Sequence, residues 1–319
     1  MEKLENYTFE SSDGHSIIHC VKWLPDREPV GVVQLVHGMV EYIERYDEFA
    51  RFLTSKGFVV VGHDHIGHGH SVENEEDLGI MTGAHPSDDM VEDILTHFSI
   101  TKKSYPGIPY FILGHSMGSY MLRKFLACKS AYLEELSGAI IMGTGFEKSA
   151  FCNFGLFMIG AISLFKGKNY RSTLIRDLTY SAPYKQYDCY GKDFANSWLT
   201  KNIKSVEKYY SDPYCTFTFS LNAYRGLVEA TKYACSKECA NKMRKNIPLL
   251  VISGEADPVG NLGAGTKAAY QELKKAGIKD VTLKLYQGDR HEILNEKDRD
   301  RVFKDIYHWL RQQLTAVSP

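Results

Sequence analysis

The run Gly114-His115-Ser116-Met117-Gly118 is the most informative stretch of the sequence, because of the segments on either side of it. The apolar, strand-like segment Tyr110 to Leu113 precedes it, and the helix-like segment Ser119 to Cys128 follows it. The order predicts a serine on a sharp turn between a strand and a helix, which is typical of hydrolytic enzymes. Glycine at the flanking positions, Gly114 and Gly118, permits the strained backbone and the close approach of strand and helix that this turn needs. The bare Gly-x-Ser-x-Gly pattern also arises by chance or as a plain turn, so the rest of the chain must support it.

Strand-like segments alternate with helix-like segments before and after this turn, and the alternation predicts parallel strands joined by helical crossovers. The dipeptide Asp13-Gly14 lies between two β-rich segments and predicts the turn of an antiparallel hairpin that opens the sheet. In chain order, the predicted segments are the strands 7–10, 17–23 and 30–36, the helix 42–55, the strand 58–63, the helix 87–103, the strands 110–113, 138–142 and 248–253, the helix 265–276, the strand 281–286 and the helix 298–314.

The alternation stops between residues 145 and 246, in a segment rich in aromatic and small residues. Unstructured loops longer than about 15 residues are uncommon in compact domains, so this segment is predicted to fold as a helical cap inserted after the sixth strand. Ligands bind at the carboxyl ends of parallel strands, and the insertion leaves one of those ends. We therefore expect an α/β core formed by residues 1–145 and 246–319, with a cap at 146–245 over the site.

The longest apolar stretch, Phe151 to Phe165, lies in the predicted cap. It is about 15 residues long and contains several polar or glycine residues, which falls short of the roughly 20 residues that span a bilayer. The sequence therefore predicts no transmembrane helix here. Two interpretations stay open: the stretch forms the cap's own core, or it contacts the substrate or a membrane surface.

Composition excludes several classes of partner. The chain has 38 basic and 39 acidic residues and a formal charge of -1, so no global field attracts nucleic acid or an anionic membrane. Seven scattered cysteines in a chain of 319 residues indicate reduced thiols and not a disulfide framework. The first six residues carry no apolar core of a signal peptide. A cytoplasmic location is expected.

A serine nucleophile needs a base and a carboxylate that orients the base. His291 lies in a polar loop after the last predicted strand, and Asp257 lies in the turn after the strand 248–253. The three residues follow the chain order Ser116, Asp257, His291, which is the order of this class of turn. Glu255 and Asp289 are rival carboxylates, but Asp257 lies at the crest of its turn.

Ester cleavage also requires hydrogen-bond donors for the oxyanion of the tetrahedral intermediate, each worth about 3 kcal/mol. One predicted donor is the backbone N–H of Met117, the residue after the serine. The second belongs to the tight turn His37-Gly38-Met39, which follows the strand 30–36, and we favour the N–H of Met39.

The segment Gly62 to Ser71 offers an alternative, because it holds four histidines and an aspartate within ten residues. Such a set could bind zinc. A metal hydrolase would activate water on the metal and leave Ser116 and its two partners without a purpose. The sequence favours the serine mechanism, and loss of activity on chelation would contradict it.

The chain resembles the serine α/β-hydrolases of the monoacylglycerol lipase and lysophospholipase type, grouped with the proline-aminopeptidase-like hydrolases. The resemblance lies in five motifs that cover both halves of the predicted sheet and nearly all the chain except the cap: His37 to Glu41 with Arg45-Tyr46, Asp64 to Ser71, Gly114 to Gly118, Gly254 to Pro258, and His291 to Glu296. It implies the α/β-hydrolase fold, a triad of Ser116, Asp257 and His291, and oxyanion donors at Met39 and Met117. It also implies that Asp64 to Ser71 is a structural turn and not a zinc site, with no metal and no cofactor.

The resemblance implies hydrolysis of a lipid-like ester, with a monoacylglycerol or a lysophospholipid as the expected substrate. A transient membrane-surface contact through the cap is also expected, and a nucleic-acid partner is not. Two alternatives remain. A peptidase would need a charged anchor for an amino terminus, for which Asp188, Asp193 and Glu207 are candidates, and a binding module without catalysis would not need the three site residues.

Overall fold

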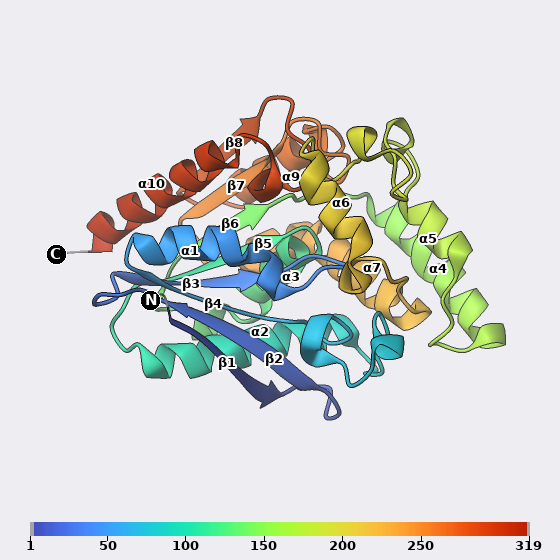
Figure 1. Cartoon of the computed structure of the whole chain (residues 1–319), viewed down its shortest axis with the longest axis horizontal. Helices are drawn as coiled ribbons and strands as arrows, with labels where there is room; N and C mark the ends of the chain where they lie inside the picture. The colour runs from blue at the N-terminus through green and yellow to red at the C-terminus, as the bar shows by residue number, and fades with distance from the viewer. Residues whose placement is uncertain (1–2, 318–319) are drawn as a thin grey trace.

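The molecule is built on one eight-stranded sheet with the strand order β1-β2-β4-β3-β5-β6-β7-β8 (Figure 1). The computed structural model describes residues 3–317. Strand β1 pairs antiparallel with β2, and β2 pairs antiparallel with β4, whereas all later pairs are parallel. The strands are β1 (Lys3–Glu10), β2 (Ile17–Leu24), β3 (Gly31–Val36), β4 (Phe58–His63), β5 (Tyr110–His115), β6 (Leu136–Met142), β7 (Leu249–Gly254) and β8 (Val281–Tyr286).

Helices cover both faces of this sheet. Side chains that alternate along β3 and β4 enter two separate hydrophobic cores, because successive residues of a strand point to opposite faces. One core is completed by α1 (Asp47–Ser55) and α10 (Arg299–Val317), and the other by α2 (Pro86–Ser104), α3 (Met117–Cys128) and α9 (Ala264–Lys275). Every residue of β3, β4, β5 and β7 is buried, which explains why these strands appear in the sequence as continuous apolar runs.

The predicted mostly parallel sheet and its antiparallel N-terminal hairpin are confirmed. One predicted helix differs. Residues 42–55 divide into a short 3-10 helix, Ile43–Tyr46, and α1, because the carboxylate of Asp64 accepts the N–H of Ile43 at 2.7 Å and fixes the turn there. The other 3-10 helices are Gly69–Ser71, Glu75–Asp77, Ser130–Tyr132, Tyr184–Gln186, Phe194–Asn196, Pro213–Cys215 and Ile293–Asn295.

The segment between β6 and β7 is helical. It contains α4 (Ser149–Lys166), α5 (Thr173–Thr179), α6 (Ile203–Ser211), α7 (Leu221–Ala234) and α8 (Lys237–Lys242). We call residues 146–245 the cap, and its exact limits stay a prediction. Helices α7 and α8 pack on α3, so the last part of the cap shares a hydrophobic core with the sheet layer, whereas α4 and α5 lie at the outer edge (Figure 1).

Helix α4 is longer than the sequence led us to expect. It runs through the interrupting polar and glycine residues for 18 residues, and 11% of it is buried. Within residues 3–317 it is one helix that is long and apolar enough to cross a membrane, by length and composition alone. In this fold it packs along α7.

A group of imidazoles lies fully buried near the carboxyl end of β4. Burial lowers the pKa of each one, to about 3 for His68 and for His97. Contacts join its members: His63 and His97 approach through their Nδ1 atoms at 2.9 Å, and the rings of His37 and His65 lie 4.3 Å apart. The group consists of His37, His63, His65, His68 and His97.

These neutral histidines make stability depend on pH. An unfolded histidine takes up a proton near pH ~6.5, whereas a buried one with a lowered pKa does not, so the folded state loses stability as the pH falls below that value. Between pH 7 and pH 5, the free energy of unfolding should fall for both proteins. We expect the fall for His97→Gln to be about 2 kcal/mol smaller than the fall for the wild type. Urea denaturation at the two pH values measures this difference.

The matched control is His308→Gln, because His308 is exposed on α10 and lies outside the buried group of imidazoles. This variant should keep the wild-type dependence on pH. An identical dependence for His97→Gln and the wild type would contradict the assignment.

Candidate active site

Ser116 lies on a strained turn between β5 and α3. Its backbone angles are φ 54° and ψ -121°, an unfavourable conformation for a residue with a side chain. A hydrogen bond from its N–H to the carbonyl of Met142, at 3.0 Å, anchors the turn to β6. A Cβ atom on Gly118 would lie 2.2 Å from the carbonyl oxygen of Val36, and one on Gly114 would lie 2.4 Å from the carbonyl oxygen of Gly118. The two predicted glycines therefore permit the close packing that places Ser116.

Asp257 and His291 come together at the ends of β7 and β8. His291 Nδ1 lies 3.0 Å and 3.1 Å from the two carboxylate oxygens, so this nitrogen carries the proton and donates it. Ser253 Oγ and the N–H of Val259 also donate to the carboxylate, at 2.7 Å and 2.9 Å. Burial opposes ionisation of Asp257, but the attraction of His291 and these hydrogen bonds hold its pKa below the ordinary value.

The rival carboxylates do not reach His291. Glu255 is exposed, and Asp289 accepts a hydrogen bond from the ammonium group of Lys201 at 2.6 Å. The structure therefore pairs His291 with the carboxylate that the turn geometry favoured.

Two aromatic rings pack on the imidazole of His291. The indole of Trp198, which belongs to the cap, stacks at 5.0 Å and 25°, and the ring of His115 lies at 4.6 Å. The N–H of His291 also donates to the carbonyl of Trp198 at 3.4 Å. Within residues 3–317 neither the Ser116 hydroxyl nor His291 Nε2 makes a hydrogen bond, so both remain available to each other and to a substrate. Hydrogen bonds between a nucleophile and its base are often long or poorly aligned in a free enzyme and tighten only when a substrate binds.

The turn that follows β3 touches the serine. A Cβ atom on Gly38 would lie 2.9 Å from Ser116 Cβ, so glycine is needed for this contact. In the described part of the chain, the N–H of Met39 donates no hydrogen bond. Met117 is the first residue of α3, and its N–H has no acceptor within its own helix. Both predicted donors thus have free N–H groups beside the nucleophile turn.

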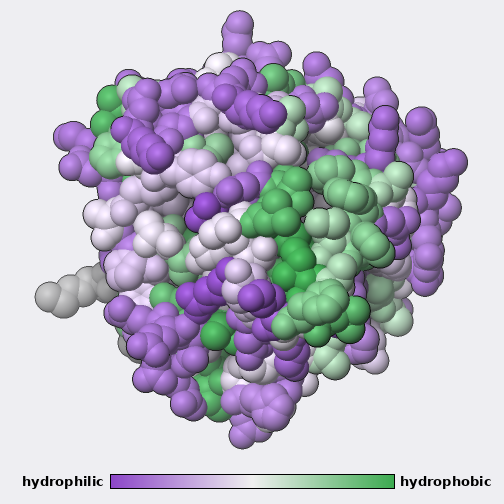
Figure 2. Space-filling view, turned by 90° about the vertical axis from the view of Figure 1, so that its right-hand side faces the viewer, coloured by the Kyte–Doolittle hydropathy of each residue, from purple (hydrophilic) through white to green (hydrophobic). Residues whose placement is uncertain are grey.

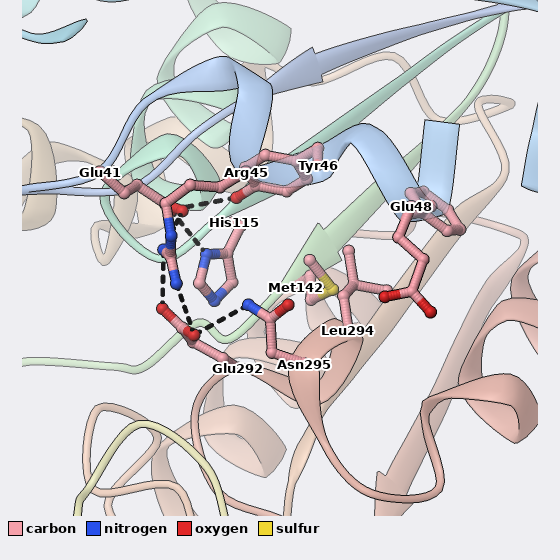
Figure 3. Close-up of a pocket in the computed structure, with 10 residues that line it drawn as sticks. Glu41, Arg45, Tyr46, Glu48, His115, Met142, Glu292, Leu294 and Asn295 are labelled. Carbon is pink, nitrogen blue, oxygen red and sulfur yellow. Dashed lines mark hydrogen bonds and ion pairs between the residues drawn. The ribbon is translucent and has the colours of Figure 1, made fainter. Parts of the chain in front are cut away.

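Sequence reasoning missed a buried ionic network beneath this site (Figure 3). Oε1 of Glu41 accepts from the N–H of Gly38 at 2.6 Å and from His115 Nδ1 at 3.0 Å, while Arg45 donates to Oε2 at 2.8 Å. Arg45 also binds both carboxylate oxygens of Glu292, at 2.9 Å and 2.8 Å. Since Glu292 directly follows His291, the network joins the turn after β3 to the loop that carries the histidine.

The charges of this network balance inside the protein. Burial opposes ionisation of Glu41, but the hydrogen bond and attraction of His115, together with Arg45, hold its pKa well below the ordinary value. Burial likewise opposes the charged form of His115, yet Glu41 raises its pKa. The pairs Glu41–His115 and Arg45–Glu292 line one side of a cavity of about 20 Å³, a volume large enough for about one water molecule. The four-residue spacing of Glu41 and Arg45 was the available signal in the sequence.

The histidine-rich segment is used structurally. Asp64 accepts hydrogen bonds from the N–H groups of Ile43 and His70, at 2.7 Å and 2.9 Å, and contacts His19 at 3.1 Å. Among residues 3–317, the carboxylates of Asp289, Glu296 and Asp298 lie close enough to share a cation, with one ligand atom of each within 4.8 Å of the others. Lys201 already supplies a positive charge to this group.

The nucleophile turn gives a test of the packing argument. We expect Gly118→Ala to destabilise the protein by roughly 3 kcal/mol, because the added methyl group meets backbone carbonyls that cannot move easily. Gly160→Ala in exposed α4 has nothing within 4 Å of its new Cβ atom and should stabilise the helix by about 1 kcal/mol. Chemical denaturation of both variants measures the difference, and equal stabilities would refute the close approach.

Comparison with known proteins agrees with this geometry. A family model described as serine aminopeptidase S33 matches residues 27–298. Human monoglyceride lipase is 27% identical over 313 residues, which cover 97% of this chain and 91% of that protein. The monoacylglycerol lipase of Mycolicibacterium smegmatis is 26% identical over 310 residues and 97% of each chain.

A solved structure, a thermostable carboxyl esterase from Bacillus coagulans in complex with glycerol, superposes with a TM-score of 0.85 at 29% identity. The match covers 98% of this chain and 100% of the esterase. The predicted α/β-hydrolase fold and the resemblance to monoacylglycerol lipases are confirmed. The chain belongs to the serine aminopeptidase S33 family and is a serine hydrolase with the α/β-hydrolase fold.

Proposed function

We propose that this serine ester hydrolase cleaves lipid-like carboxylic esters, with monoacylglycerols or lysophospholipids as substrates, through Ser116, His291 and Asp257. The observation that carries the proposal is the buried hydrogen bond between His291 and Asp257, beside a serine on a strained turn. The names of the relatives, which are lipases of monoacylglycerols and a carboxyl esterase, support the substrate class.

The proposed reaction has two steps. His291 Nε2 takes the proton of the Ser116 hydroxyl as its oxygen attacks the ester carbonyl, and the N–H groups of Met39 and Met117 bind the resulting oxyanion. The imidazolium then protonates the leaving alcohol, which gives an acyl-enzyme on Ser116. Water, deprotonated by the same histidine, attacks the acyl group and releases the fatty acid. Asp257 keeps the imidazole in the required tautomer and stabilises its positive charge.

The peptidase alternative has less support from the cap. The carboxylate of Asp188 accepts backbone N–H groups of Tyr190, Lys192 and Asp193, and Asp193 caps the following 3-10 helix. Glu207 is exposed on α6. The three proposed anchors are thus used in local loops or face solvent, which favours an ester without a charged amino terminus.

The outer face of the cap supports a further part of the proposal, a transient contact with a membrane surface. Figure 2 shows apolar residues gathered on the side of the molecule that carries α4 and α5. Phe157 is 70% exposed, Leu164 85% and Phe165 87%. Lys148 directly precedes the helix and Lys166 is its last residue. An apolar helix face between lysines is suited to lie in a lipid interface, where these substrates reside.

Vesicle binding tests this contact. We expect Leu164→Glu/Phe165→Glu to lower sedimentation with phosphatidylcholine vesicles at least about tenfold, because two charges would have to enter the interface. Hydrolysis of a soluble short-chain ester should stay unchanged. The control Ile203→Glu replaces an exposed apolar residue on α6. Equal loss of binding in both variants would contradict a contact through α4.

The catalytic assignment is tested with Ser116→Ala. We expect the variant to fold normally and to lose hydrolysis of short acyl esters by at least about 10³-fold, because the nucleophile is gone. A panel of acyl chains and head groups, compared by kcat/KM, then defines the substrate. Full activity in the variant would overturn the serine mechanism, and equal rates on aminoacyl amides would favour the peptidase.

A further inference from the structure

From the contacts around the turn after β3, we infer that the cap completes the oxyanion site through Tyr209, a positioning residue on α6. The inference rests on the proposed function, because it concerns how the N–H of Met39 is aimed at the oxyanion. It assigns to the cap a role in the rate of the chemical step, in addition to covering the substrate.

Buried side chains hold each peptide unit of this turn. The unit between His37 and Gly38 is fixed by Glu41, which accepts the N–H of Gly38 at 2.6 Å. The next unit contains both the carbonyl of Gly38 and the N–H of Met39, and His37 Nδ1 donates to that carbonyl at 2.8 Å. Because the peptide is planar and trans, fixing the carbonyl points the N–H of Met39 in the opposite direction.

The following two units are held through Val40. Its N–H donates to His68 Nε2 at 3.3 Å, and its carbonyl accepts from the hydroxyl of Tyr209 at 3.0 Å. Val40 has a φ of 56°, which is a true outlier for a β-branched residue. A strained residue of this kind keeps its conformation only while its surroundings enforce it. Of the four side chains that hold the turn, Tyr209 is the one that comes from the cap.

Tyr209 is itself firmly placed. Its side chain is buried, and the guanidinium group of Arg45 lies over its ring at 4.9 Å from the centroid. At the end of the same helix, Asp212 accepts a hydrogen bond from the hydroxyl of Tyr42 at 2.8 Å. Helix α6 is therefore attached to the segment after the turn at two points.

A displacement of α6 would remove the hydrogen bond to Val40 and leave a strained peptide with one support fewer. The turn could then relax, and the N–H of Met39 would leave the direction that the oxyanion needs. The position of the cap and the strength of oxyanion stabilisation are thereby coupled in one molecule.

The chain offers a matched pair for the test, because Tyr209 and Tyr210 are neighbours on α6. The hydroxyl of Tyr210 is buried and has no hydrogen-bond partner among the described residues. Tyr209→Phe removes the hydrogen bond to Val40 and keeps the ring. We expect it to lower kcat on a soluble short-chain ester roughly tenfold, since a misaligned donor loses part of its stabilisation, and to leave KM unchanged. Tyr210→Phe should stay within about twofold of the wild type.

A boronic acid separates positioning from general stability, because its adduct with Ser116 mimics the tetrahedral intermediate and places an oxygen in the oxyanion site. Its affinity for Tyr209→Phe should fall by the same factor as kcat, while the affinity for a non-hydrolysable substrate analogue should not change. Equal kcat in the two variants, or a change confined to KM, would overturn the inference.

The rate at which a fluorophosphonate labels Ser116 in the same variants keeps the two proposals apart. Slower labelling of Tyr209→Phe than of Tyr210→Phe supports the role of Tyr209 even when the wild type rejects lipid esters, a result that would overturn only the proposed substrate. Equal labelling rates would overturn the role of Tyr209.

Discussion

The close approach of the start of α3 to the end of β3 is the constraint on which the site depends. Without a side chain at position 118, the backbone of α3 lies directly against the carbonyls of Val36 and His37. This contact places Ser116 next to the turn at Gly38 and Met39, on a sheet whose parallel strands all end at this edge. The positive φ of Ser116 follows from the same packing, and the two cores on either side of the sheet supply the stability that offsets the strain.

Buried charges then hold the separate loops of the site in register. Isolated charges would be costly in the interior, but Glu41, Arg45, Glu292 and His115 form complementary pairs with short hydrogen bonds. They connect the turn after β3, the residue before Ser116 and the loop of His291. When loops are fixed in this way, the hydrogen-bond donors that they carry need not reorient as charge develops in a transition state. Such preorganisation lowers the barrier.

Much of the fold and of the candidate site could be predicted from the sequence, because both depend on local patterns. The parallel strands appear as short apolar runs, and Ser116, Asp257 and His291 each lie within a few residues of the end of such a run. The preference for Asp257 over Asp289, which rested on its place at the crest of the turn, also agrees with the observed pairing. In contrast, the length of α4 was underestimated, because glycine and polar residues at exposed positions do not interrupt a helix that packs along α7.

The contacts of Trp198 with His291 and of Tyr209 with Val40 had no signal in the sequence. Both depend on how about one hundred inserted residues fold back over the sheet, which no local pattern records. The role of Glu41 was missed for a related reason: its partners His115 and Glu292 are distant in sequence and meet only in the folded chain.

Trapping the covalent intermediate tests the proposed serine mechanism most directly. Rapid acid quenching of the wild-type enzyme milliseconds after mixing with a monoacylglycerol, followed by mass spectrometry of its peptides, would detect an acyl group. A serine mechanism predicts the mass of one fatty acyl chain on the peptide that contains Ser116, formed before fatty acid accumulates. Turnover of the ester with no acylated peptide, or with the acyl group on another residue, would contradict it.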